Sequence, residues 1–139
     1  MTDCIFCKIA RHEVPARVIY EDNEFIAFLD QYPASPGHTL IIPKSHYQNI
    51  FEVPALTISG LYAKAKDISY ALSQAMDTPN LNVLQNNGAL AGQTVFHYHV
   101  HLVPRYEADG VVMKWSSSPP AAPAALDDIA SSIKSFISF

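Results

Sequence analysis

His97-Tyr98-His99-Val100-His101-Leu102-Val103 alternates histidine with apolar or aromatic residues. Successive side chains of a β-strand point to opposite faces. The three histidines are therefore predicted to share one face, while Tyr98, Val100 and Leu102 share the other and are suited to burial. Alternate side chains lie about 6.5–7 Å apart, which separates the outer histidines by roughly 13 Å. One small ligand cannot contact all three imidazoles equally, so we expect them to have different functions.

Length and composition predict one globular domain. The chain has 139 residues, of which 49% are hydrophobic and 16% charged, enough to bury a sizeable core. No run approaches the ~20 apolar residues of a membrane span, and no signal sequence is recognisable. We expect a cytoplasmic protein with a single domain over residues 1–139, divided into a core (1–115) and a C-terminal tail and helix (116–139).

The periodicity of apolar residues predicts an α+β fold with a mainly antiparallel five-stranded sheet. Alternating and β-branched residues indicate strands, and apolar residues at three- and four-residue steps indicate one long helix and a short C-terminal one. The strands are expected at Val18–Tyr20, Glu24–Leu29, His38–Pro43, Leu81–Leu84 and the histidine-rich stretch. The long helix is expected over Leu56–Met76, and an extended tail over Ser116–Ala125 precedes a helix with Ile129, Ile133 and Ile137 on one face.

Charge argues against a nucleic-acid partner. The formal net charge is −4, whereas sequence-independent binding to a polyanion needs clustered Lys and Arg. An anionic ligand would have to be held by backbone N–H groups, histidines and neutral donors. This favours a small phosphate ligand over a polymer.

The polar loop before the histidines is suited to hold that phosphate. The segment 86–94 supplies amides, a hydroxyl and two glycines whose backbone can approach a ligand closely. Two chemistries could use the histidines: a catalytic zinc on His97 and His99, or attack of a neutral His99 on phosphorus, with His101 contacting the phosphate or the leaving group. No Asp or Glu lies in this stretch to ligate a metal or to activate metal-bound water, which favours the covalent route.

At these residues the chain resembles the histidine triad superfamily, whose motif is His-φ-His-φ-His-φ-φ with φ apolar. Further segments similar to its nucleotide-binding branch are Cys4–Ile9, Glu13–Ala16, Phe28–Asp30, Pro36–His46 and Asn86–Gly88.

The resemblance implies a role for each matching residue. His99 would be the nucleophile at the α-phosphorus, and Asp30 would accept hydrogen bonds from the ribose hydroxyls. His101, Asn86, Gly92, Thr94 and Val95 match phosphate-contacting positions, with Gln93 among them. The apolar slot for the base would comprise Ile5, Phe6, Ile9, Phe28 and Leu29.

The resemblance also indicates which reaction the chain catalyses and how its copies assemble. Relatives that transfer nucleotides carry glutamine in place of the third histidine, so His101 points to hydrolysis. The family pattern implies a homodimer with one continuous sheet, in which Trp115 resembles a tryptophan that reaches towards the partner's site.

Cys4 and Cys7 form a Cys-x-x-Cys pair at the N-terminus. A thioredoxin-like redox pair would follow a strand of a βαβ unit, which this pair does not. Structural zinc needs four ligands, and His46 and His97 are the candidates for the other two. The chain resembles many bacterial-type relatives with both cysteines, which have such a Cys₂His₂ site, so we expect a structural zinc and no catalytic cofactor. His12 is expected on the surface, and His38 is expected to support the site.

Three function classes remain open. The favoured one is a metal-independent hydrolase of nucleoside 5′-phosphoramidates or related purine nucleotide conjugates, including dinucleoside polyphosphates. The second is a nucleotide-binding interaction protein with little physiological catalysis. The third is a zinc-dependent hydrolase.

Overall fold

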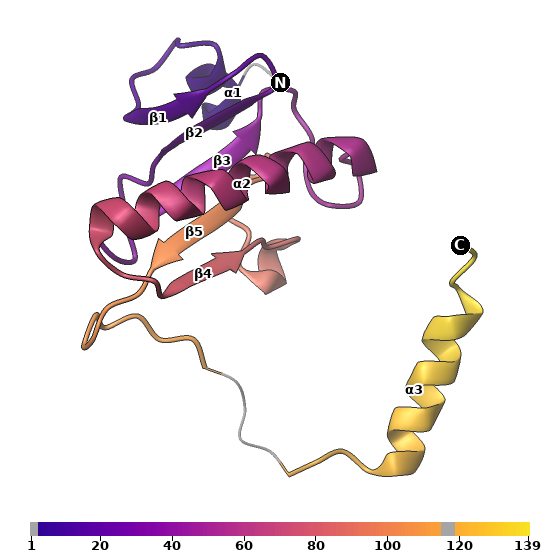
Figure 1. Cartoon of the computed structure of the whole chain (residues 1–139). Coiled ribbons are helices and arrows are strands. Elements are labelled where there is room, and N and C mark those ends of the chain that lie inside the picture. Colours follow the sequence, from indigo (N-terminus) through magenta and orange to yellow (C-terminus); the bar gives the residue numbers. More distant parts are fainter. Residues whose placement is uncertain (1–2, 115–118) are drawn as a thin grey trace.

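The fold is a single antiparallel sheet with one long helix across one face, shown by a computed structural model that describes residues 3–114 and 119–139 (Figure 1). The sheet order is β1-β2-β3-β5-β4, and every neighbouring pair is antiparallel. The strands are β1 (Val18–Glu21), β2 (Phe25–Leu29), β3 (Thr39–Pro43), β4 (Leu81–Leu84) and β5 (Val100–Pro104), and the helices are α1 (Ile5–Ala10), α2 (Ala55–Met76) and α3 (Pro123–Ser135), with a short 3₁₀ turn at Ala89–Ala91. The predicted α+β fold is confirmed.

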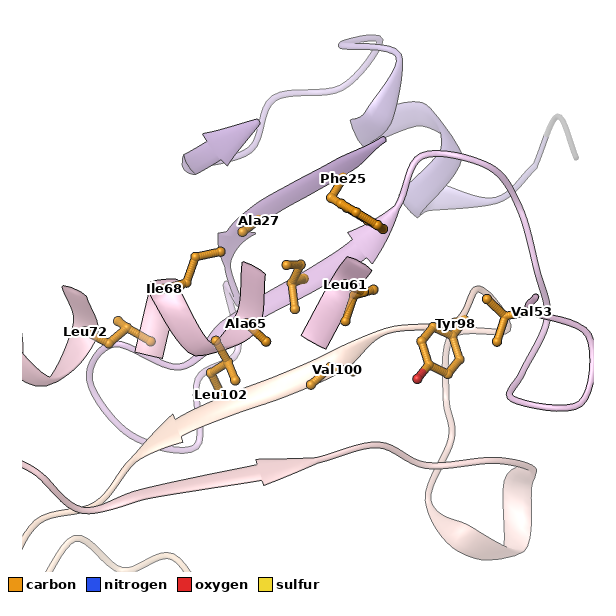
Figure 2. Close-up of a cluster of buried hydrophobic side chains, with 11 residues drawn as sticks. Phe25, Ala27, Val53, Leu61, Ala65, Ile68, Leu72, Tyr98, Val100 and Leu102 are labelled. Atoms are coloured by element: carbon orange, nitrogen blue, oxygen red, sulfur yellow. The ribbon is translucent and has the colours of Figure 1, made fainter. Parts of the chain in front are cut away.

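The main core lies between α2 and the sheet (Figure 2). Helix residues at steps of three and four, including Leu61, Ala65 and Ile68, contact Val100 and Leu102 of β5 in one cluster. Tyr98 joins this cluster with 1% of its surface exposed. The predicted division is therefore observed: the residues between the histidines pack beneath α2.

The opposite face of the sheet is covered by a second cluster. Phe28 and Leu40 of the sheet pack against Phe6 and Ile9 of α1. His101 pairs with Leu40 across the β3–β5 ladder, and because paired residues lie on the same face of a sheet, the histidines open onto this second face.

Three predictions about local structure need correction. Helix α1 was not expected, because it has only six residues and too few turns to show a helical period. The fifth strand begins at Val100, so that His97 and His99 precede it, because the N–H of Tyr98 donates to the carbonyl of Tyr47 in a loop instead of to a strand.

The C-terminal helix is the third correction. It begins at Pro123, inside the segment expected to be extended, and Ile137 lies beyond its end. Proline suits the first turn of a helix because it lacks an N–H that would need a partner. Trp115 and residues 116–118 lie outside the described residues. Within the described residues, no helix has both the length and the apolar character needed to cross a membrane.

The position of α2 above the sheet predicts a large contrast between two leucines of the same helix. Leu61 is fully buried, whereas Leu56 is 85% exposed. We expect Leu61→Ala to lower the free energy of unfolding by about 2–5 kcal/mol, because the substitution leaves a cavity. Leu56→Ala, the matched control, should change it by less than about 0.5 kcal/mol. Urea unfolding followed by circular dichroism measures both, and equal losses would contradict this packing.

Candidate functional site

A pocket of about 920 Å³ lies on the second face of the sheet, beside the histidines. Its walls come from α1, the loop before β1, the end of β2 and the segment 94–101. Ten of the residues predicted from the sequence line it: Ile5, Phe6, Ile9, Phe28, Leu29, Asp30, Thr94, Val95, His99 and His101. The structure thus brings together a carboxylate, two imidazoles and an apolar wall.

Asn86, Gly92 and Gln93 do not line this pocket. Gln93 is buried, and its amide is committed to the loop: the side-chain oxygen accepts from the Gly88 N–H at 2.8 Å, and the amide nitrogen donates to the Gln48 carbonyl at 2.7 Å. Gln93 therefore braces the loop from inside. Gly92 has φ +93°, a left-handed conformation that glycine adopts without steric cost.

The structure adds pocket residues that the sequence reasoning did not select. Arg17, Gln31 and Tyr32 line the pocket near Asp30. Arg17 is the only cation of these three and could contact an anionic ligand. Its position directly before the predicted strand at Val18 was an available signal, since loop residues at strand ends commonly carry function.

His99 is held in one tautomer by the backbone. Its Nδ1 donates to the carbonyl oxygen of His97 at 2.7 Å. A neutral imidazole has one N–H and one lone pair, so the lone pair lies on Nε2. Burial lowers the pKa of His99, partly opposed by this backbone hydrogen bond and by the charge of Asp30. The ring is therefore neutral near pH 7 and available as a nucleophile or base.

A hydrogen bond from His38 determines which ring nitrogen of His101 carries the proton. The N–H of Ala34 donates to Nδ1 of His38 at 2.9 Å, which places the proton of a neutral His38 on Nε2. That Nε2 lies 2.9 Å from Nδ1 of His101 and donates to it. His101 consequently carries its own proton on Nε2. Burial lowers the pKa of His101 to about 4, assisted by positive charge on His99 or His38, so a neutral N–H donor is available there.

The same tautomer argues against a metal at Asp30, His38 and His101, although their ligand atoms lie within 4.8 Å of one another. The protonated Nε2 of His38 has no lone pair to offer. Asp30 has other contacts: one carboxylate oxygen accepts from the Tyr32 N–H at 2.9 Å, and the other lies 3.7 Å from Nε2 of His38. His38 and His101 are therefore a hydrogen-bonded pair, and Asp30 is a neighbouring negative charge.

A second cluster, of two thiols and two histidines, lies next to Phe6. Cys4, Cys7, His46 and His97 place their ligand atoms within 4.8 Å of one another. His97 Nδ1 lies 3.4 Å from Cys4 Sγ, 3.5 Å from Cys7 Sγ and 3.2 Å from His46 Nδ1, and His46 Nδ1 lies 3.3 Å from Cys7 Sγ.

These four spacings are close to the edge lengths expected of a tetrahedral zinc site. Zinc bonds of about 2.3 Å to sulfur and about 2.0–2.1 Å to nitrogen imply edges of about 3.6 Å for S···N and about 3.3 Å for N···N. His97 is also in the required tautomer, because Nε2 donates to the Pro43 carbonyl at 2.8 Å and leaves the Nδ1 lone pair towards the thiols. All four protein ligands leave no open position for a reacting water, so the donor set fits a structural zinc.

Helix α1 connects this cluster to the pocket. Cys4 caps the helix, its sulfur accepting from the Cys7 N–H at 3.4 Å. Phe6, between the two cysteines, lies edge-on to both His97 and His99, with ring centroids 6.0 and 5.1 Å away. The thiols therefore anchor the same short helix that supplies Phe6 to the pocket wall.

Comparison with known proteins gives consistent matches. A family model described as HIT domain matches residues 11–108. The chain is 46% identical over 107 residues to adenylylsulfatase HINT3 of Arabidopsis thaliana, covering 77% of this chain and 54% of that protein. It is 42% identical over 113 residues to adenosine 5′-monophosphoramidase HNT1 of Saccharomyces cerevisiae, covering 81% of this chain and 69% of that protein.

Solved structures agree over most of the chain. A crystal structure of a HIT family member from Bacillus subtilis has a TM-score of 0.92 at 38% identity and covers 99% of both chains, α3 included. A zinc-bound histidine triad family protein from Mycobacterium smegmatis has a TM-score of 0.76 at 36% identity, covering 84% of this chain and 85% of that one.

The tetrahedral donor cluster predicts stabilisation by zinc. We expect equimolar zinc to raise the melting temperature of the metal-free protein, since a metal at a hundred times its Kd stabilises by about 2.7 kcal/mol. Cys7→Ala should abolish the rise, measured by differential scanning calorimetry. His12→Ala is the matched control, because His12 is exposed and contacts Glu21 on the surface. A rise that persists in Cys7→Ala would contradict this site.

Proposed function

The chain belongs to the HIT family, and on that premise we propose that it hydrolyses nucleoside 5′-phosphoramidates or related nucleotide conjugates at the α-phosphate. The observation that carries the proposal is the hydrogen bond of 2.7 Å from His99 Nδ1 to the His97 carbonyl, which leaves a nucleophilic lone pair on Nε2 of a residue that lines the pocket. Two relatives support the substrate class, because the names of both specify an adenosine 5′-phosphoryl group with different leaving groups.

In the proposed mechanism, Nε2 of His99 attacks the α-phosphorus. The bond from phosphorus to the leaving nitrogen or oxygen breaks, and its electron pair remains with the leaving group. The Nε2–H of His101 donates a hydrogen bond to that atom or to a phosphoryl oxygen, and the leaving group takes its proton from solvent, while His38 holds the His101 ring in the donating tautomer. The oxygen of a water molecule then bonds to phosphorus as the phosphorus–nitrogen bond to His99 breaks, and the electron pair of that bond returns to Nε2. The proton that water loses passes to solvent, so that the nucleoside monophosphate is released and neutral His99 is restored.

The pocket supplies the binding elements for such a substrate. The second carboxylate oxygen of Asp30 is available for the ribose hydroxyls, since the first is occupied by Tyr32. A purine would lie between the apolar side chains of α1 and β2, where Phe6 and Phe28 pack edge-on with ring centroids 5.4 Å apart. Thr94 and Val95 line the pocket beside His99 and are placed to contact the phosphate.

We also propose that zinc occupies the Cys4, Cys7, His46 and His97 cluster in a structural role. The edge lengths of the cluster and the zinc-bound Mycobacterium smegmatis neighbour support this. Zinc would hold α1 against the sheet, and the nucleophile would act without it.

A homodimer joined through β4 completes the proposal. β4 is at the edge of the described sheet, and Val83 is 46% exposed there. An exposed edge strand presents unpaired backbone groups that a second strand can satisfy. Pairing of two β4 strands would continue the sheet across both copies.

Removal of the nucleophile tests the proposed reaction. We expect His99→Ala to lower kcat/KM for adenosine 5′-phosphoramidate by roughly a thousandfold or more, whereas the surface variant His12→Ala should retain the wild-type value. Mass spectrometry of the quenched wild-type protein should find an adenylyl group on the peptide that contains His99. Unchanged turnover in His99→Ala would contradict the mechanism. Wild-type protein that binds AMP tightly but turns over no conjugate would instead indicate a nucleotide-binding interaction protein.

Burial of His99 also predicts the pH dependence. Its lowered pKa keeps the imidazole neutral below about 6.5, the ordinary histidine value. As pH falls, kcat/KM should therefore stay near its maximum past pH 6.5 and decline only at lower pH, when Nε2 becomes protonated. Steady-state rates with a substrate that does not titrate in this range measure the profile. A midpoint above pH 6.5 would contradict the assignment of a buried, neutral nucleophile.

A further inference from the structure

Helix α3 has an apolar side that is exposed in the part of the chain that the structure describes. Leu126, Ile129 and Ile133 follow one another at steps of three and four residues, and Phe136 and Ile137 continue the stripe just past the helix end. All of them are exposed, Ile129 and Ile133 by 57% each. Asp127, Ser131 and Lys134 lie on the opposite side. The pattern is that of a helix with one face intended for burial.

A helix of this length needs a partner to be stable. It has 13 residues, and isolated helices shorter than about 12–15 residues are marginal in water. The crystal structure from Bacillus subtilis overlays with this helix included. Its apolar face therefore needs a covering surface, which the described residues of its own domain do not supply in this structure.

An apolar groove on the core domain has matching character. It has a volume of about 620 Å³ and runs between the C-terminal half of α2 and the start of the sheet. Its floor and sides include Ile19, Ile68, Leu72 and Met76, and Ala71 and Ala75 leave room along the helix. Ile19 is 46% exposed.

Helix α3 lies away from the α2 groove of its own chain. The Arg105 guanidinium donates to the Val111 carbonyl at 2.9 Å and pairs with Asp109 at 2.8 Å, which fixes how the chain leaves β5. Helix α3 lies beyond β4, on the far side of the sheet from β1 (Figure 1). The groove is lined instead by residues of β1, of the end of β2 and of the C-terminal half of α2.

In a homodimer with its twofold axis at β4, α3 of one copy would lie on the same side as the second copy. Rotation of the domain about the edge strand moves the β1 side of the second copy to the side on which α3 of the first copy lies. A lipid surface is less suitable for this helix, because interfacial helices carry a polar face rich in Lys and Arg, whereas α3 has Asp127 and Asp128 against the single Lys134.

We propose that α3 of each copy packs its apolar stripe into the α2 groove of the other copy, so that the homodimer exchanges its C-terminal helices. The inference rests on the proposed β4-mediated homodimer and adds an interface to it. The two helices act as reciprocal arms, in addition to the continuous sheet.

Photo-cross-linking of the full-length protein tests this arrangement. The photoreactive residue p-benzoylphenylalanine replaces Ile133 in a tagged chain, which is mixed with an untagged ¹⁵N-labelled chain and allowed to exchange. We expect the tagged chain to cross-link to the heavy form of the peptide that contains Ala71 and Ala75. Ala71→Glu in the labelled chain should cause loss of this cross-link, since the groove would then bury an unpaired charge. The same photoreactive residue at Ser131, on the polar side of α3, is the matched control and should not label this peptide.

The outcomes separate the inference from the homodimer on which it rests. The labelled chain could be recovered together with the tagged chain while no cross-link to the labelled α2 peptide is found. That result would overturn the exchange of helices but would still support the homodimer. Cross-links to the light α2 peptide alone would show that α3 folds back on its own domain, which would overturn the proposal. Binding of the protein to vesicles of phosphatidylcholine and phosphatidylserine would place α3 on a membrane and would overturn it too. Failure to recover any heavy chain, with a monomeric mass by native mass spectrometry, would overturn the homodimer as well.

Discussion

Burial of Tyr98, Val100 and Leu102 beneath α2 is the constraint on which the site depends. These side chains pack with Leu61, Ala65 and Ile68 in the main core, and a shift of one residue would exchange the two faces of the strand. Such a shift would move three imidazoles into an apolar core and expose the residues that fill it. The hydrophobic effect, acting on the apolar side of this segment, therefore sets the direction of the histidines on the other side.

Backbone carbonyls then give the histidines different chemistry. The carbonyl of Pro43 takes the Nε2 proton of His97 and leaves Nδ1 for the thiol cluster, whereas the carbonyl of His97 takes the Nδ1 proton of His99 and leaves Nε2 for the pocket. In His101 the direction is reversed, because the ring accepts from His38. Three chemically identical side chains thus become a metal ligand, a nucleophile and a hydrogen-bond donor through their hydrogen-bond partners, in the roles proposed for them.

Helix α1 makes the two neighbouring sites interdependent. Its cap and its first turn carry the thiols, and Phe6 between them packs against the rings of His97 and His99. A helix of six residues has little stability of its own. Its position depends on the thiol cluster and on the apolar contacts of Phe6 and Ile9 with the sheet. The position of this wall of the pocket therefore depends on a cluster that takes no part in the proposed bond cleavage.

The sequence by itself determined the sheet, α2 and the division of the histidine segment into two faces. Local periodicity is a property of consecutive residues, and Leu81–Leu84 and the end of α2 at Met76 agree with the structure for that reason. The tertiary structure decided which ring nitrogen of each histidine carries its proton, because the partners lie far away in sequence: Pro43 for His97, and Ala34 through His38 for His101. It also revealed α1, whose cap is a cysteine instead of the usual Ser, Thr, Asp or Asn, and the inward commitment of Gln93. Alternation along a strand determines only on which face a side chain lies; hydrogen bonds from distant backbone determine which of its atoms can react.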